Sequence, residues 1–450
     1  MIHQVQNPAS SRREWLKTWG CGFGYLALAG LATEAASADA VRGPLAPKTP
    51  HFPPKAKRVI FLFMQGGPSQ HETFDYNPEL AAAAAKGASV FGSPFGFQQH
   101  GQSGLWISEL FPNLARHADS LCLLNGMHAD SPAHPQATIQ MHTGSFNLVR
   151  PSMGSWVVYG LGTENQELPG FLTINPVALG GAQNYGSAFL PATYQGTPYL
   201  TRNGKLPNIA NPSMSAEVQR QQLDLVQSLN QDFLKKAQKD AELEGLAQSF
   251  EMAFRMQSSV PGVLDIEKEP PAVKKLYGID KPATRGFGMQ CLLARRMAEA
   301  GVRFVEITHG NWDHHNNLKN RITQTCGEID QPIAALITDL QQRGLFEDTL
   351  LVWGGEFGRT TTGQNGDGRN HNNRGFTMWM AGGGVKGGAR HGAADAVTGS
   401  AVAGKVHLHD LHATILHLLG LDHTKLTYRY GGRDFRLTDV HGVVAKEILG

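Results

Sequence analysis

Cysteine is scarce in this chain of 450 residues, which contains four. Cys21 falls within the first forty residues, and the other three are too few and too far apart for a disulfide framework or a thiolate metal site. Charge is also low, since Asp, Glu, Lys and Arg make up 17% of the residues and 40 basic residues balance 38 acidic ones. Without a basic run, we expect neither a phosphate-neutralising surface nor a nucleic-acid partner.

Two catalytic signatures are missing as well. The chain has no Gly-x-Ser-x-Gly sequence, which argues against an esterase of the α/β-hydrolase type. It has no Gly-x-x-x-x-Gly-Lys-Ser/Thr loop, which argues against an NTPase. The apolar run at 20–32 is shorter than the roughly 20 residues of a spanning helix, so we expect no stable membrane span in the mature protein.

Residues 1–38 have the pattern of an export signal. Arg12, Arg13 and Lys17 precede the apolar run, and the small residues at 36–38 suit signal peptidase. The arginine pair resembles a twin-arginine signal, which carries folded proteins. We expect the segment to be cleaved and the mature protein to be periplasmic or secreted; an uncleaved anchor is the alternative.

The rest of the chain predicts one elaborated α/β domain. Residues 39–57 are rich in proline and predict an extended arm. From 58 to 450, apolar runs typical of buried parallel strands alternate with helical patterns, which predicts a mainly parallel central sheet flanked by helices. The runs lie at 58–64, 121–124, 171–174, 302–308, 349–353 and 377–381, and the helical patterns at 215–256, 285–300 and 320–343, the last broken by Pro332.

Histidine is distributed unevenly along the chain. Of 19 histidines, six fall between His71 and His142 and eleven between His309 and His441, with none in the 166 residues between these stretches. Sites in open parallel sheets lie beyond the carboxyl ends of the strands, and the His-rich segments follow predicted strands. We therefore expect a site built from both ends of the chain, with the region around 143–300 as an insertion or cap.

The segment 65–71 follows the first predicted strand. Its two glycines allow backbone amides to approach a bound oxyanion, and its polar side chains add donors or ligands. A tight turn without a ligand is the competing interpretation. The expected substrate-binding residues here are Gln65, Gly66, Gly67, Ser69 and His71.

The segment 128–134 precedes an apolar helical stretch. Ser131, followed by Pro132, is expected near a helix start, where free amides and the helix dipole favour an anion or an activated oxygen. Ser131 is therefore a candidate nucleophile or phosphate-binding donor, and His134 a candidate substrate-binding residue. The alternative is that Ser131, or Asp130, only caps the helix.

Later segments supply potential metal ligands. Asp313 and His314 follow the predicted strand at 302–308, Glu356 follows the next strand, and His371 lies in a polar loop. Carboxylate and imidazole donors suit zinc or manganese-like ions. We expect a divalent metal at these four residues, zinc first, with manganese and calcium as alternatives.

Arg359 lies three residues after Glu356. A guanidinium recognises phosphate or sulfate in a bidentate manner, so we expect Arg359 to hold an anionic oxygen during catalysis; a simple ion pair is the alternative. Near the C-terminus, Asp410 is expected to cap a helix. The histidines expected to be structural there are His407, His409, His412 and His417.

These segments, in this order, resemble the exported bacterial family known as domain of unknown function 1501, a relative of the alkaline phosphatase and sulfatase superfamily. The resemblance runs from about Val59 to the C-terminus and is densest at 66–69, 301–317, 356–360, 381–384 and 410–420. It implies an alkaline phosphatase-like fold and phosphoryl or sulfuryl transfer through two metals and a nucleophile at a helix start. By position, it implies Asp313, Glu356 and His371 as ligands, with Ser131 or Asp130 in the nucleophile region.

The chain departs from the superfamily pattern at three positions. Gln65 replaces an Asp, Phe357 a His and Asn317 a His, and each exchange removes a metal ligand. The complete two-metal centre is therefore not expected from the matching positions alone. No Cys-x-Pro-x-Arg sequence is present, which argues against a formylglycine sulfatase. Nearby residues that could refill the site are His71, Asp75, His314 and His315.

Two functional hypotheses follow. The first is an exported metal-dependent hydrolase of phosphate or sulfate esters that acts on an anionic small molecule or glycan ester. The second is a catalytically degenerate member that binds an anionic ligand, a sulfated glycan or a partner protein, without turnover. The oligomeric state is left open.

Overall fold

The computed structural model describes residues 43–203, 213–236 and 241–450 of the chain. The predicted export signal lies outside these residues. The part of the proline-rich arm within them packs on the main body, because the amides of His51 and Phe52 donate to the carbonyl of Gly420 and that of Lys55 to the carbonyl of Leu418. No helix among the described residues has the length and apolar character needed to cross a membrane.

A nine-stranded sheet forms the centre of the fold, in the order β12-β4-β11-β8-β1-β7-β5-β6, with β15 paired to β4. All of its pairings are parallel except those made by β11, which confirms the predicted α/β class with a mainly parallel sheet. The strands are β1 (Arg58–Met64), β4 (Leu121–His128), β5 (Phe171–Ile174), β6 (Thr197–Tyr199), β7 (Phe304–His309), β8 (Thr349–Gly354), β11 (Phe376–Ala381), β12 (Ala389–His391) and β15 (Val406–His407).

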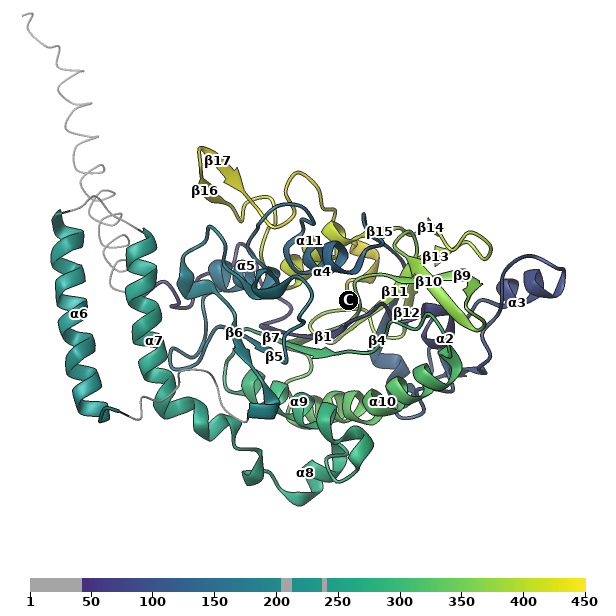
Figure 1. The fold of residues 1–450 in the computed structure, drawn as a ribbon, viewed down its shortest axis with the longest axis horizontal. Helices are drawn as coiled ribbons and strands as arrows, with labels where there is room; N and C mark the ends of the chain where they lie inside the picture. Colours follow the sequence, from purple (N-terminus) through teal and green to yellow (C-terminus); the bar gives the residue numbers. More distant parts are fainter. Residues whose placement is uncertain (1–42, 204–212, 237–240) are drawn as a thin grey trace, which may run out of the picture.

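Helices cover both faces of this sheet (Figure 1). One face carries α4 (His134–Thr143), α5 (Met153–Leu161) and α11 (Leu408–Leu418), and the other carries α9 (Pro282–Glu299) and α10 (Leu318–Gln342). Strand β1 is buried along its whole length, and its successive side chains point to opposite faces. Val59, Phe61 and Phe63 therefore join the core under α4, α5 and α11, whereas Ile60, Leu62 and Met64 join the core over α9 and α10.

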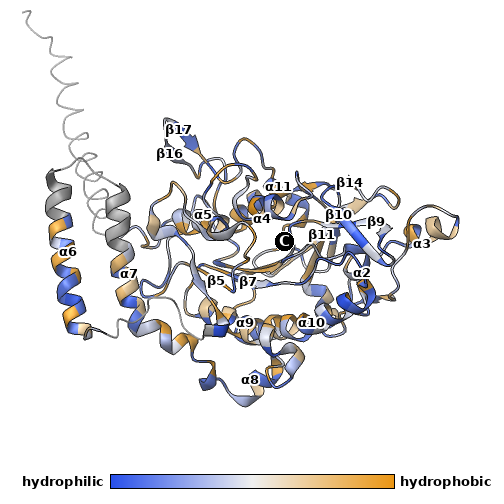
Figure 2. Ribbon diagram, viewed as in Figure 1, coloured by the Kyte–Doolittle hydropathy of each residue, from blue (hydrophilic) through white to orange (hydrophobic). Residues whose placement is uncertain are grey.

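The helices that cover the sheet have one hydrophobic face, whereas the central strands are hydrophobic on both faces. Figure 2 shows hydrophobic and hydrophilic residues alternating along α10, as expected for a helix with one buried face. In the central strands, the hydrophobic colours run almost without interruption. A sheet that is covered on both faces requires this composition.

The His-free middle region is not a separate insertion. It supplies β5 and β6 to the central sheet and α5 and α9 to its two faces. The pattern at 215–256 forms two helices, α6 (Ala216–Lys236) and α7 (Ala241–Leu264), which stand beside the main body (Figure 1). The C-terminal part of α7 packs into the core through Met256 and Val260.

Two predicted helix features differ from the structure. Helix α10 continues through Pro332, because both of its halves are held by buried packing against α9 and the 3-10 helix η1 (Leu114–Ser120). Helix α11 is capped by the side chain of His407, which accepts from the amide of His409, while Asp410 occupies the third helical position and accepts from the amide of His407. Asp410 therefore completes a capping box and is not the cap itself.

The remaining elements border the site or the surface. Cys122, Cys291 and Cys326 are buried and free, so the described residues contain no disulfide. The other helices and strands are α2 (Gln70–Thr73), α3 (Pro78–Ala85), β2 (Phe97–His100), β3 (Leu105–Ser108), α8 (Pro271–Leu276), β9 (Gly358–Gln364), β10 (Gly368–Asn372), β13 (Ala393–Ala394), β14 (Ala401–Ala403), β16 (Tyr428–Tyr430) and β17 (Arg433–Phe435).

Candidate metal centre

Connections from four strands meet at one edge of the sheet. Strands β1, β4, β7 and β8 run in the same direction, so their carboxyl ends lie along this edge. Strand β11 runs the other way and begins at the same edge, and therefore the preceding β9–β10 hairpin also arrives there. Segments far apart in the sequence are brought together at this edge, as in other open parallel sheets.

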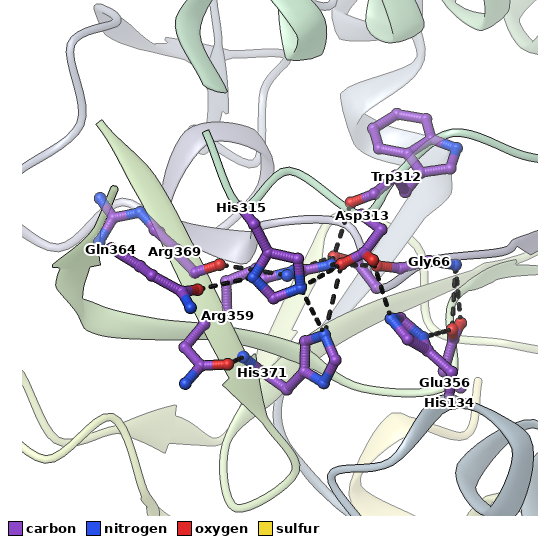
Figure 3. Close-up of polar contacts among 12 residues, drawn as sticks. Gly66, His134, Trp312, Asp313, His315, Glu356, Arg359, Gln364, Arg369 and His371 are labelled. Atoms are coloured by element: carbon purple, nitrogen blue, oxygen red, sulfur yellow. Dashed lines mark hydrogen bonds and ion pairs between the residues drawn. The ribbon is translucent and has the colours of Figure 1, made fainter. Parts of the chain in front are cut away.

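Four side chains from three of these connections form one group, here called the His/Asp group (Figure 3). It consists of His134 at the first position of α4, Asp313 and His315 after β7, and His371 on β10. One ligand atom from each lies within 4.8 Å of the others. Asp313 is at the centre, with Nε2 of His134 3.3 Å from its Oδ2, and Nε2 of His315 and His371 2.8 Å and 3.3 Å from its Oδ1.

The other ring nitrogen of each histidine in the group faces an oxygen atom. Each such oxygen accepts a hydrogen bond from Nδ1, which leaves Nε2 of a neutral ring with a lone pair for a metal. Metal-binding histidines are oriented in this way by carboxylates and carbonyls. The pairs are His134 with Glu356 Oε1 at 2.6 Å, His315 with Gln364 Oε1 at 2.6 Å, and His371 with the carbonyl of Pro132 at 2.7 Å.

The charge around His134 favours a cation. Burial opposes protonation of the ring, but hydrogen bonds to Asp313 and Glu356 outweigh it and raise the pKa of His134 to about 9. Burial likewise disfavours the Asp313 carboxylate, yet hydrogen bonds from His134, His371 and Arg359 hold the pKa of Asp313 well below its usual range. Two carboxylates on either side of one imidazole therefore require positive charge there, either a proton or a metal ion on Nε2.

Glu356 is fully buried and lies behind His134, outside the group. The amide of Gly66 donates to both of its carboxylate oxygens, at 3.0 and 3.1 Å. Gly66 has a φ of 117°, and a Cβ there would lie 2.7 Å from the amide nitrogen of Asp313. A glycine at this position therefore allows the β1, β7 and β8 connections to pack together.

The neighbouring residues of this turn also serve packing. A Cβ at Gly67 would lie 2.7 Å from the Phe357 ring. Gln65 contributes its carbonyl, which accepts from the amide of Trp312 at 3.2 Å. The turn thus holds the connections in place through its backbone. Among the described contacts, none joins a side chain of this turn to the His/Asp group, so its expected role in substrate binding stays a prediction.

Arg359 does not lie where a substrate could reach it. Its side chain is fully buried, and its guanidinium bonds to oxygens of the surrounding connections. It therefore supports these connections and Asp313, which corrects the expectation that it holds an anionic oxygen of the substrate. Its acceptors are the carbonyls of Gly67 at 2.9 Å, Arg369 at 3.2 Å, Trp312 at 3.3 Å and Gly66, and Oδ1 of Asp313 at 2.6 Å.

His314 lies outside the group, and the adjacent His315 lies within it. The His314 ring lies 6.2 Å from the Trp312 ring between centroids, and His314 is not among the grouped residues. Burial, followed by the charges of Arg321 and Arg359, lowers the pKa of His314 to about 4. His314 is therefore a neutral buried side chain and not one of the grouped ligands.

Ser69 and His71 are buried beside β9. Nε2 of His71 lies 3.1 Å from the carbonyl of Arg359, and burial, with Arg369 nearby, lowers the pKa of His71 well below its usual value. Neither residue belongs to the His/Asp group. Their contacts are those of structural residues behind the site.

Ser131 lies in the connection between β4 and α4. Its Oγ accepts from the amide of Ala133 at 3.2 Å, and Ala133 is the N-cap of α4, so neither Ser131 nor Asp130 caps this helix. Asp130 is instead hydrogen-bonded by Gln140 and faces His407 at 3.2 Å. The connection reaches the His/Asp group through a backbone carbonyl and the ring of His134, without a contact from the Ser131 hydroxyl.

The donor set discriminates among the expected ions. Three imidazole nitrogens and one carboxylate oxygen suit zinc, and imidazole and carboxylate are also found with manganese and other transition metals. Calcium takes oxygen ligands throughout, so it does not fit these residues.

A family model described as "Protein of unknown function (DUF1501)" matches residues 56–449. The chain belongs to this family. No curated protein matches it. Solved structures of the alkaline phosphatase and sulfatase superfamily resemble the DUF1501 chain at low identity.

Three of these structures illustrate the degree of similarity. The PsFucS1 sulfatase from Pseudoalteromonas sp. is 14% identical, with 81% of this chain and 68% of that chain covered and a TM-score of 0.37. A mutant of TAB5 alkaline phosphatase is 10% identical, with 82% and 99% covered and a TM-score of 0.37. The lipoteichoic acid synthase LtaP from Listeria monocytogenes is 10% identical, with 88% and 78% covered and a TM-score of 0.36. At this distance, no activity is carried over to the DUF1501 protein.

Sequence reasoning placed Asp313 and His371 in the site but missed part of its surroundings. His134 was expected to bind substrate, and His315 was only a possible replacement ligand. A signal for His315 existed, since it follows Asp313 closely in a polar turn. No local signal marks Gln364 or the carbonyl of Pro132, because their contacts depend on how the β9–β10 hairpin and the β4–α4 connection meet.

Proposed function

We propose that this DUF1501 protein is an exported, metal-dependent hydrolase of phosphate or sulfate esters, acting on anionic small molecules or glycan esters. One observation carries the proposal: three Nε2 atoms converge on Asp313 while each Nδ1 is bonded to an oxygen. The group is also open to solvent, since the Asp313 side chain is 42% exposed. A ligand set that is oriented from behind and open in front suits a catalytic rather than a structural metal.

The residues of the site have two proposed roles: some would bind the metal ion, and others orient the residues that bind it. His134, Asp313, His315 and His371 would hold a divalent ion, which would supply Lewis acidity towards the ester oxygens. Glu356, Gln364 and the Pro132 carbonyl fix the three rings from behind. Arg359 fixes Asp313 and the turn after β1, so the ligands are in place before an ion or substrate arrives.

Water is the proposed nucleophile. Among the residues that the structure describes, no hydroxyl side chain is hydrogen-bonded to the His/Asp group, and Ser131 is engaged with its own turn. Hydrolysis then forms a bond from the water oxygen to phosphorus or sulfur and breaks the bond to the alcohol, which leaves with a proton. Because the Ser131 hydroxyl makes no contact with the group, Ser131→Ala is expected to leave turnover within about twofold of wild type.

The direct test combines metal analysis with ester hydrolysis. Wild-type protein, purified from its native host, is assayed for bound metal and for turnover of 4-nitrophenyl phosphate and 4-nitrophenyl sulfate, next to Asp313→Asn and the control His417→Ala. We expect the Asp313 variant to lose both metal and turnover, and the control to retain both. Full metal content with unchanged turnover in Asp313→Asn would overturn the proposal.

A non-catalytic binding protein is the second candidate. The observation that favours it is that Arg359 is buried and already hydrogen-bonded, so that no guanidinium among the described residues is free beside the group to contact a transferring phosphoryl or sulfuryl group. Calorimetric binding of a sulfated saccharide, together with no turnover of any ester by metal-loaded protein, would support this candidate against the hydrolase.

Export belongs to the proposal and rests on the N-terminal sequence alone. Expression in a host with a twin-arginine pathway, followed by N-terminal sequencing, tests it. A mature chain that begins near residue 39 is expected, and loss of export in Arg12→Lys with Arg13→Lys would identify the route. An intact N-terminus on protein retained in the cytoplasm would contradict export.

A further inference from the structure

We infer that the site selects esters with one negative charge at the reacting phosphorus or sulfur, namely sulfate monoesters or phosphate diesters, over doubly charged phosphate monoesters. The inference rests on the proposed function and narrows its substrate class. It comes from the charges that surround the His/Asp group and from the burial of Arg359, which contacts Asp313.

The side chains around the group carry little net charge. Among the described residues, the charged side chains that hydrogen-bond or ion-pair with the group are Glu356 and Arg359, which offset each other. The three rings are neutral when each donates from Nδ1 and offers Nε2. Asp313 then leaves a single net negative charge, which a divalent ion converts to a single net positive charge.

Within the described ranges of the chain, no further cation contacts the group to balance a second negative charge. Arg359 is fully buried and directed at carbonyls and Asp313, away from solvent. Arg321 affects the pKa values of His314 and Arg359 by its charge but makes no hydrogen bond or ion pair with the group in the described structure. The start of α4 at His134 adds only a partial positive charge.

A monoanion therefore neutralises the site, whereas a dianion leaves an excess negative charge beside Asp313 and Glu356. Glu356 lies 2.6 Å from His134 and is shielded from water, so salt screens its charge poorly. Sulfate monoesters and phosphate diesters share the required charge, and separate assays distinguish them.

The test compares three aryl esters with metal-loaded wild-type protein at pH 8. We expect kcat/KM for 4-nitrophenyl sulfate or bis(4-nitrophenyl) phosphate to exceed that for 4-nitrophenyl phosphate by about tenfold or more. Because the second ionisation of a phosphate monoester lies near pH 6, the monoester should gain relative to the diester between pH 8 and pH 5. The faster of the first two substrates identifies the source of the monoanion.

A binding measurement gives a readout independent of turnover. Methyl sulfate and dimethyl phosphate, both monoanions, are expected to raise the melting temperature of the metal-loaded protein more than methyl phosphate does at pH 8. Substitution Glu356→Gln removes one negative charge and should shift the kcat/KM ratio towards the monoester by about tenfold at saturating metal. Glu328→Gln is the matched control, since Glu328 pairs with His309 outside the group, at 3.0 Å.

The possible outcomes distinguish failure of the charge inference from failure of the proposed function. Turnover of the phosphate monoester faster than both monoanions at pH 8 would overturn the charge inference while the hydrolase stands. No turnover of any of the three esters by protein with its full metal content would instead overturn the proposed function. An unchanged ratio in Glu356→Gln would also contradict the charge inference.

Discussion

Two groups of histidines in this protein make similar hydrogen bonds to oxygen atoms but differ in what surrounds the second ring nitrogen. In α11, Nε2 of His409 and His412 bonds the carbonyls of Gly144 and Met141, both at 2.7 Å, and the rings are buried. Their Nδ1 atoms have no hydrogen-bond partner among the described residues. In the His/Asp group, one nitrogen of each ring is also bonded to an oxygen, but the other faces Asp313 in partly exposed surroundings. What the second nitrogen faces, and not the number of histidines, distinguishes a ligand site from helix packing.

The pKa values of the histidines also differ between the two groups. Burial, followed by the charge of His409, lowers the pKa of His412 to about 3, so this ring is neutral in the folded protein. His134 is also partly buried, yet its two carboxylate partners raise its pKa to about 9. The same residue type is therefore kept neutral in one region and placed where positive charge is required in the other.

The largest expected effect comes from removing the centre of the site. Asp313→Ala should weaken metal binding by at least about 100-fold, because losing a ligand exceeds the 10–100-fold cost of losing its outer partner. Metal analysis after dialysis against a weak chelator measures this. His412→Gln, in the α11 group, should retain full metal content; equal loss in both variants would erase the distinction between the groups.

Removing an orienting carboxylate should have an intermediate effect. Glu356→Gln leaves all four ligands but weakens the hold on Nδ1 of His134, so we expect metal affinity to fall by about 10–100-fold. A competition titration with a chromogenic chelator checks this. Glu328→Gln, which affects a His–Glu pair outside the group, should change affinity less than twofold, and a larger change in the control would sink the assignment of Glu356.

Removing an uncharged residue that orients a ligand should reduce metal affinity less. Gln364→Leu removes the acceptor for Nδ1 of His315, and water can replace it because His315 is 29% exposed. We expect a loss of affinity near the lower end of that range, about tenfold or less. The same titration with Gln341→Leu, on α10 away from the site, supplies the baseline. A loss equal to that of Glu356→Gln would show that charge plays no part in the orientation.

The contrast between the histidine groups also marks what the sequence could predict. Apolar runs located β1, β5 and β8 within one residue, because a doubly covered parallel sheet leaves a continuous local signal. Asp313 was predicted because polar residues after such strands share one edge. His371 was predicted from its polar segment and from the resemblance to the superfamily pattern. That His315 and not His314 joins the group depends on side-chain directions, and the buried hydrogen bonds of Arg359 depend on long-range packing. Neither leaves a local pattern in the sequence.

The last expected effect concerns stability in acid and not metal affinity. His412 has a pKa of about 3 when folded and about 6.5 when unfolded, so the unfolded state binds more protons between these values and stability falls as the pH drops through this window. His412→Gln can still donate to the Met141 carbonyl but does not titrate. The melting temperature of wild type should therefore fall more than that of the variant between pH 7 and pH 4. His441→Gln, at an exposed position, should follow wild type, and parallel curves for all three proteins would contradict burial of a neutral ring.

The central claim is that three rings and one carboxylate hold one metal ion. Anomalous diffraction at the zinc edge, from crystals of the zinc-loaded mature chain, tests it most directly. The account predicts a single peak about 2.0–2.1 Å from Nε2 of His134, His315 and His371 and at a similar distance from an oxygen of Asp313. No peak between these atoms, or a zinc ion held at the α11 histidines instead, would contradict it.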